Sequence, residues 1–272
     1  MNLFLWALWV AVIIAIAIWA FGGARRRRLG ALREAAEEGG FTESDREHLK
    51  KHVRSMEGMP EDLKKRLEVL TLVLIAEKNF EACGDLEEVT REMRVVIMAQ
   101  AAFLLLGRDH DFFPKLRTVL VYPEAYRGKD HEGEDEEGGR LGESWESGTV
   151  VLSWTSVQRG GENDEDGMNV VIHEFAHQLD QENDHADGLP ELGKGQSIGR
   201  WASTFSAAYE TFCDDLDAGR RTVMDAYGGT NPAEFFAVAS ETFFEKPRQL
   251  KIDEPSLYDQ LTTFYGVDPS SW

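Results

Sequence analysis

The pentapeptide His173-Glu174-Phe175-Ala176-His177 combines residue types and spacing that suit a zinc-binding catalytic motif. Two imidazoles four residues apart project from the same side of an α-helix, about one turn apart, so they can share one tetrahedral ion. Glu174 stands next to the first histidine and can reach a water that the ion activates. The motif therefore predicts metal-dependent hydrolysis, with His173 and His177 as ligands and Glu174 as the general base.

The residues around the motif have the periodicity of a core helix. The face opposite the apolar stripe carries His173, His177 and Asp180. Asp180 lies one turn beyond His177, so it is either an acid at a helix end or a hydrogen-bond acceptor that orients a ligand. The apolar stripe consists of Met168, Val171, Ile172, Phe175, Ala176 and Leu179.

A catalytic zinc ion needs a third protein ligand and one open position. The motif with Gly and His three and six residues after the second His is excluded, because Asp180 and Asn183 stand there. The other common arrangement takes a Glu from a downstream helix, which residues 231–244 are predicted to form. Glu234 and Glu241 differ by about 20° around its axis and share a face. One can bind the metal while the other supports a ligand.

Each glutamate also has a simpler interpretation. Glu234 falls in the first turn, after Asn231 and Pro232, where an acid favours the helix dipole. Glu241 alone would be a solvated surface charge. The surrounding apolar residues favour a buried carboxylate that needs a counter-charge, which zinc supplies. These apolar neighbours are Phe235, Phe236, Val238, Ala239, Phe243 and Phe244.

Three segments together resemble the Mlc titration factor A family of zinc metallopeptidases. They are residues 170–180, the tripeptide Asp225-Ala226-Tyr227, and residues 231–238 with their Pro-Ala-Glu sequence. The resemblance covers roughly residues 60 to 270. It implies an α+β, zincin-like metallopeptidase domain, in which helices surround a small mixed sheet.

The same resemblance implies a role for each site residue. His173, His177 and Glu234 bind one Zn²⁺ per chain, and Glu174 is the base. Tyr227, seven residues before the third ligand, donates a hydrogen bond to the oxyanion of the tetrahedral intermediate. Taken alone, a tyrosine before two glycines is more often a packing residue.

The amino-terminal segment predicts a membrane anchor. Residues 3–21 carry no charged or polar side chain, and as a helix they span about 28 Å, close to the hydrocarbon thickness of a bilayer. Four arginines, residues 25–28, follow at once, whereas a cleaved signal peptide needs its positive charge at the start. Basic residues stay in the cytoplasm. We therefore expect a single N-terminal transmembrane helix in the bacterial inner membrane, with the catalytic domain facing the cytoplasm.

The chain is expected to divide into an anchor (1–24), a charged juxtamembrane linker (25–60) and the metallopeptidase domain (61–272). Strand 148–154 precedes the motif helix, either as an edge strand that pairs with extended substrate or as an ordinary core strand. The acidic, Gly-rich segment 124–147 predicts a long loop. Further helices are expected over 61–75, 95–106 and 200–216, a strand over 116–122 and a loop over 187–199.

A formal net charge of −20 argues against nucleic-acid binding, which needs clustered Lys and Arg. The two cysteines, Cys83 and Cys213, lack metal-ligand spacing and fit a reducing compartment.

These features predict a membrane-anchored zinc peptidase that acts on peptides or proteins, with aminopeptidase activity implied by the resemblance. The alternative is a membrane-tethered regulatory protein that sequesters an Mlc-like transcriptional repressor or another partner and keeps zinc for structure. Glu174 argues against the alternative, because a structural zinc site needs no base.

Overall fold

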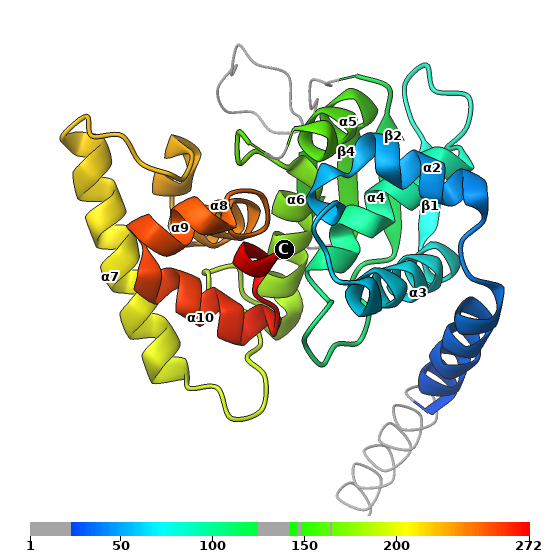
Figure 1. Ribbon diagram of the computed structural model, residues 1–272, viewed down its shortest axis with the longest axis horizontal. Coiled ribbons are helices and arrows are strands. Elements are labelled where there is room, and N and C mark those ends of the chain that lie inside the picture. Colours follow the sequence, from blue (N-terminus) through cyan, green and yellow to red (C-terminus); the bar gives the residue numbers. More distant parts are fainter. Residues whose placement is uncertain (1–22, 125–141, 146–147, 164) are drawn as a thin grey trace, which may run out of the picture.

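The computed structural model describes residues 23–124, 142–145, 148–163 and 165–272. Helix α6 lies between a group of elements that includes the sheet and a group of helices that includes α8 (Figure 1), and it contacts both α4 and α8. The helices are residues 23–39, α2 (Glu43–His52), η1 (Arg54–Met56), α3 (Glu61–Glu77), α4 (Arg91–Phe103), α5 (Trp154–Glu162), α6 (Val170–Asp180), η2 (Gln181–Asn183), α7 (Ile198–Asp217), η3 (Ala226–Gly229), α8 (Pro232–Glu245), α9 (Pro247–Asp253), α10 (Pro255–Tyr265) and η4 (Pro269–Ser271).

The described strands form one sheet in the order β1-β2-β4-β3, parallel except for the antiparallel β3–β4 pair. The strand predicted over 148–154 is β4, which lies between β2 and β3 and is therefore a core strand rather than an edge. The prediction of a loop throughout 124–147 is wrong for β3, whose pairing with β4 no local pattern revealed. The strands are β1 (Asn79–Ala82), β2 (Thr118–Tyr122), β3 (Gly142–Trp145) and β4 (Thr149–Ser153).

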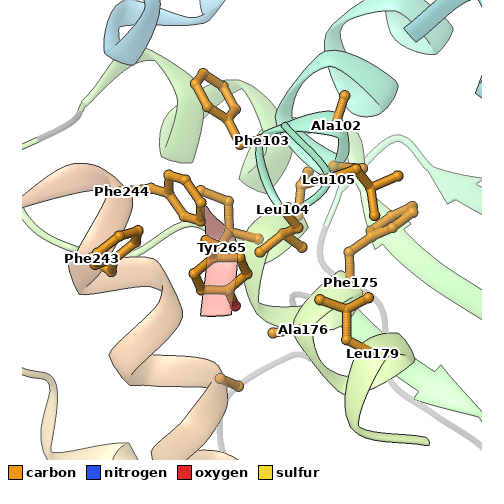
Figure 2. Packing of buried hydrophobic residues seen from close by; sticks show 14 of the residues in the cluster. Ala102, Phe103, Leu104, Leu105, Phe175, Ala176, Leu179, Phe243, Phe244 and Tyr265 are labelled. Carbon is orange, nitrogen blue, oxygen red and sulfur yellow. The ribbon is translucent and has the colours of Figure 1, made fainter. Parts of the chain in front are cut away.

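Helices α6 and α8 share one hydrophobic core with the end of α4 and with α10. Figure 2 shows Phe175 of α6 on the side of Leu105, and Phe243 and Phe244 of α8 beside Tyr265 of α10. The Tyr265 hydroxyl lies 2.6 Å from Ser240 Oγ, so its polar end is satisfied inside the core. Burying an aromatic side chain of this kind stabilises the fold by about 1.5–3 kcal/mol. This packing holds the two helices with the predicted ligands against each other.

Both helices begin at asparagine side chains. Asn231 Oδ1 accepts from the backbone N–H groups of Ala233 and Glu234, each at 3.0 Å, and Pro232 occupies the first helical position. The predicted start of this helix is therefore confirmed. Asn169 caps α6 in the same way, through the N–H groups of Val171 and Ile172.

Residues 25–60, which the sequence predicts as a charged linker, are helical over much of their length. The helix 23–39 packs through Leu29 and Ala36 against Val73 of α3. Phe41, Leu49, Val53 and Met59 belong to the main hydrophobic core.

The predicted location in the bacterial inner membrane is corrected by the helices that the structure describes. None of them is both long enough and apolar enough to cross a bilayer. Helix α7 has 20 residues, but charged side chains such as Arg200 and Glu210 interrupt its apolar sequence. On this finding, the prediction of a single-pass protein with its catalytic domain facing the cytoplasm is wrong. Residues 3–21, the predicted anchor, lie outside the described residues.

The loop after η2 is fixed against the start of α8 by one glycine. Gly188 has a φ of +79°, and a Cβ there would lie 2.5 Å from the carbonyl oxygen of Pro232. Its N–H donates to Asp180 Oδ2 at 2.9 Å, and its carbonyl accepts from Trp201 Nε1 at 3.0 Å. A side chain at this position would push the loop away from α8.

We expect Gly188→Ala to destabilise the fold more than Gly195→Ala. Gly195 also has a positive φ, +85°, but no atom lies within 4 Å of a Cβ built there. Alanine in the left-handed region costs about 1–2 kcal/mol at either position, and the Pro232 contact adds to this only at Gly188. Denaturant unfolding of both variants measures the difference. Equal losses would show that the contact does not constrain the loop.

Candidate metal centre

Three potential ligand atoms from α6 and α8 face one another. Glu234 Oε2 lies 3.0 Å from His173 Nε2 and 3.2 Å from His177 Nε2, and the two nitrogens are 3.2 Å apart. Ligands of a tetrahedral ion with bonds of about 2.0 Å are separated by about 3.3 Å. Two imidazoles and a carboxylate are also donors that zinc prefers. The three side chains therefore fit a bound zinc ion in both chemistry and spacing.

Glu241 orients the first of these ligands. Its Oε1 lies 2.7 Å from His173 Nδ1, and its Oε2 accepts from the Asn169 N–H at 2.5 Å. Because a carboxylate only accepts, Nδ1 of His173 is the donor, and Nε2 is left to face Glu234 and His177. Glu241 is buried, so the structure does not place it as a solvated surface charge.

Asp180, the other acid predicted to orient a ligand, contacts the loop after η2 instead. Its Oδ2 accepts from Gly188, so it holds the loop rather than a ligand. Its Oδ1 has no hydrogen-bond partner among the described residues, and burial raises the pKa of the carboxyl to about 6. Of the two acids predicted to orient a ligand, only Glu241 contacts a histidine of the motif in the part of the chain that the structure describes.

The two predicted catalytic residues differ in their exposure to solvent. Glu174 is 6% exposed and precedes Phe175 on α6. Tyr227 is 53% exposed, and its ring centroid lies 5.9 Å from that of His173. The side chain of Asp225 caps η3 by accepting from the Tyr227 N–H at 2.9 Å. An exposed phenol ring therefore lies near the first histidine of the motif.

The carboxylates shift the protonation of the site. Burial disfavours the charged form of His173, but Glu241 and Glu234 outweigh it, and the pKa of His173 is raised well above its ordinary value. Burial likewise raises the pKa of Glu234, but hydrogen bonds with His173 and His177 outweigh it and lower that pKa to about 2. These shifts favour a protonated His173 imidazole beside an ionised Glu234 in the metal-free protein.

Sequence reasoning missed two residues that contact this network. Asn169 donates its backbone N–H to Glu241, and Gln100 of α4 accepts from the Asn169 side chain at 2.8 Å. A signal existed for each. Asn169 immediately precedes the apolar motif helix, as a capping residue does, and Gln100 is a polar residue within an otherwise apolar stretch of α4.

A helix with two histidines and an adjacent glutamate, joined by a glutamate from a second helix, defines the site of a metallopeptidase. Comparison with family models gives the same class. Residues 24–266 match the family described as glucose-regulated metallo-peptidase M90, and the chain belongs to this family.

Curated relatives agree with the family. An uncharacterized protein of Synechocystis sp. is 38% identical over 213 residues, covering 76% of this chain and 77% of the relative. Mlc titration factor A of Cronobacter sakazakii is 34% identical over 195 residues, covering 68% and 71%. The protein of the same name from Escherichia fergusonii is 37% identical over 189 residues, covering 66% and 69%. The resemblance read from the sequence is thereby confirmed.

We expect Glu241→Gln to weaken zinc binding about 10- to 100-fold, the usual effect of losing a carboxylate that orients a metal-binding histidine. Asp180→Asn is the matched control, because Asp180 is also buried but holds Gly188. It should keep the wild-type affinity within about threefold, since it removes no bond to a ligand. Competition with a zinc chelator measures both. Similar losses in the two variants would contradict the distinction.

Zinc affinity should rise with pH across neutrality. Because the folded-state pKa of His173 is raised, its contribution to the stability of the metal-free protein is complete below about pH 6.5. That contribution is lost as the pH rises through the raised value. Zinc must displace this proton, so the association constant should rise with pH between pH 6.5 and 8, by at most about tenfold per pH unit. An affinity that stays constant over this range would show an ordinary His173 pKa.

Proposed function

We propose that this metallopeptidase is a zinc-dependent hydrolase of peptide bonds with a zincin-like α+β fold. The observation that carries the proposal is the convergence of His173, His177 and Glu234. Glu174 follows His173 on α6, and the Tyr227 ring centroid lies 5.9 Å from that of His173. Zinc is the metal that this donor set and spacing favour, although affinity alone does not exclude other divalent ions.

Each residue around the centre has a separate role in the proposed reaction. When bound, zinc supplies a Lewis acid that polarises the scissile carbonyl and acidifies water. Glu174 takes the proton of the attacking water and delivers it to the leaving amine. The Tyr227 hydroxyl donates to the oxygen on which negative charge develops. Glu241 keeps the His173 ring in place throughout.

We propose further that the preferred substrates have a free amino terminus. The family resemblance supports aminopeptidase activity. The net charge of −20 also attracts cationic amino termini towards the protein. An acetylated peptide lacks that charge, so comparing free and acetylated forms of one peptide separates aminopeptidase from endopeptidase action.

A second candidate function is repressor binding. Relatives that are 34% and 37% identical bear the name Mlc titration factor A. This name supports the proposal that the present chain also binds a repressor similar to Mlc. Binding of this kind needs a protein surface rather than the proton transfer assigned to Glu174. The two functions can therefore be separated by substituting this one residue.

We expect Glu174→Gln to lower peptide hydrolysis at least about 100-fold, because it removes the general base. Zinc content should remain one per chain, since Glu174 is not a ligand. Hydrolysis is measured on the full chain with fluorogenic amino-terminal and internally quenched peptides, and Glu234→Ala serves as the variant that loses metal. Undiminished hydrolysis by Glu174→Gln contradicts the base assignment. Zinc-loaded wild type that cleaves no peptide favours the binding function.

A further inference from the structure

Asn169 connects three helices around the metal centre. Its side-chain Oδ1 accepts from the N–H groups of Val171 and Ile172 at 3.1 and 3.0 Å, which caps α6. Its Nδ2 donates to Gln100 Oε1 of α4 at 2.8 Å, and its backbone N–H donates to Glu241 Oε2 of α8. Asn169 is only 2% exposed. One buried residue thus contacts the helix of the histidines, the helix of Glu234 and α4.

The direction of these hydrogen bonds is fixed at both ends by the backbone. Gln100 Nε2 faces the carbonyl oxygens of Val96 and Val157 at 3.2 and 3.5 Å, which can only accept. Gln100 must therefore present its oxygen to Asn169. The first-turn N–H groups of α6 can only donate, so Asn169 must turn its oxygen to them and its nitrogen to Gln100. No other orientation of the two amides satisfies all of these groups.

Close packing prevents this unit from shifting. A Cβ at Gly160 of α5 would lie 3.0 Å from the Asn169 Cα, and a Cβ at Gly161 would lie 3.1 Å from Gln100 Oε1 and 2.0 Å from the carbonyl oxygen of His52. The two glycines therefore let α5 approach the backbone of Asn169 and the side chain of Gln100. Both amides are held by neighbours on several sides, as well as by each other.

From these contacts we infer that Asn169 and Gln100 are positioning residues of the metal centre. They fix the backbone of residue 169, whose N–H fixes Glu241, and Glu241 orients the His173 ring. The inference rests on the proposed zinc peptidase, but it concerns metal affinity and ligand geometry rather than hydrolysis. Serine at 169 could still cap α6 but could not reach Gln100. Aspartate would place a second acceptor against Gln100 Oε1.

The test uses the full chain with Asn169→Ser, Gln100→Ala and the double variant. Ser197→Ala is the matched control, because Ser197 caps α7 by accepting from the Arg200 N–H at 3.3 Å and contacts none of the ligands in the described structure. Three quantities are measured for each protein. They are the Zn²⁺ dissociation constant by chelator competition, the visible absorption spectrum of the Co²⁺-loaded form, and the unfolding temperature of the metal-free form.

We expect each single variant to bind Zn²⁺ about tenfold or more weakly and to show altered Co²⁺ bands. The double variant should bind Zn²⁺ only slightly more weakly than the single variant with the lower affinity, because both substitutions break the same hydrogen bond between Asn169 and Gln100. Ser197→Ala should lower the unfolding temperature while keeping wild-type affinity and spectrum. Gln100→Ala leaves the α6 cap in place, so it tests the inference even where Asn169→Ser folds poorly.

Variants that lose only thermal stability, with wild-type zinc affinity and Co²⁺ spectra, would overturn the inference. Independent, additive losses of affinity would also overturn it, because they would show two separate effects. Wild type that binds zinc but cleaves no peptide would count against the proposed hydrolysis alone, since affinity and spectrum still decide the positioning role. Wild type that binds no zinc would overturn both.

Discussion

Three potential metal ligands lie 3.0–3.2 Å apart, a spacing that is favourable only with a proton or a cation between them. Glu234 and the two histidines stay close together because α6 and α8 pack in a common aromatic and aliphatic core. The energy that holds the ligands together is therefore mainly hydrophobic packing at a distance from the site. The geometry of the candidate metal centre therefore depends on that packing.

Polar contacts then orient the side chains that the hydrophobic packing brings together. Glu241 is on the same helix as Glu234, two turns further on, so one element supplies both a ligand and the carboxylate that orients His173. Asn169 links α6 to α8, because its side chain caps α6 and its backbone N–H donates to Glu241 of α8. The relative rotation of the two helices is thus set at their adjoining ends. Gly188 and Asp180 stabilise the loop that abuts the start of α8.

Local periodicity was sufficient to predict the ligand helices and the faces they present. His173 and His177 follow from a spacing of four, and Glu234 with Glu241 from a spacing of seven, so helical geometry alone brings each pair to one face. The partner of Asp180 and the pairing of β3 depend on tertiary contacts, which no single segment encodes. Asn169 and Gln100 left local signals, but their bond joins residues 69 positions apart. The membrane location was inferred from residues 3–21 and is contradicted by the described helices.

X-ray absorption fine structure of the zinc-loaded full chain tests the central claim most directly. We expect one zinc per chain with nitrogen and oxygen neighbours at about 2.0–2.2 Å, among them two imidazoles. We also expect Glu234→Ala, which loses the metal, to give no such zinc signal when it is prepared in the same way. Sulfur neighbours at about 2.3 Å, or a single imidazole, would place the metal elsewhere and contradict a centre built from His173, His177 and Glu234.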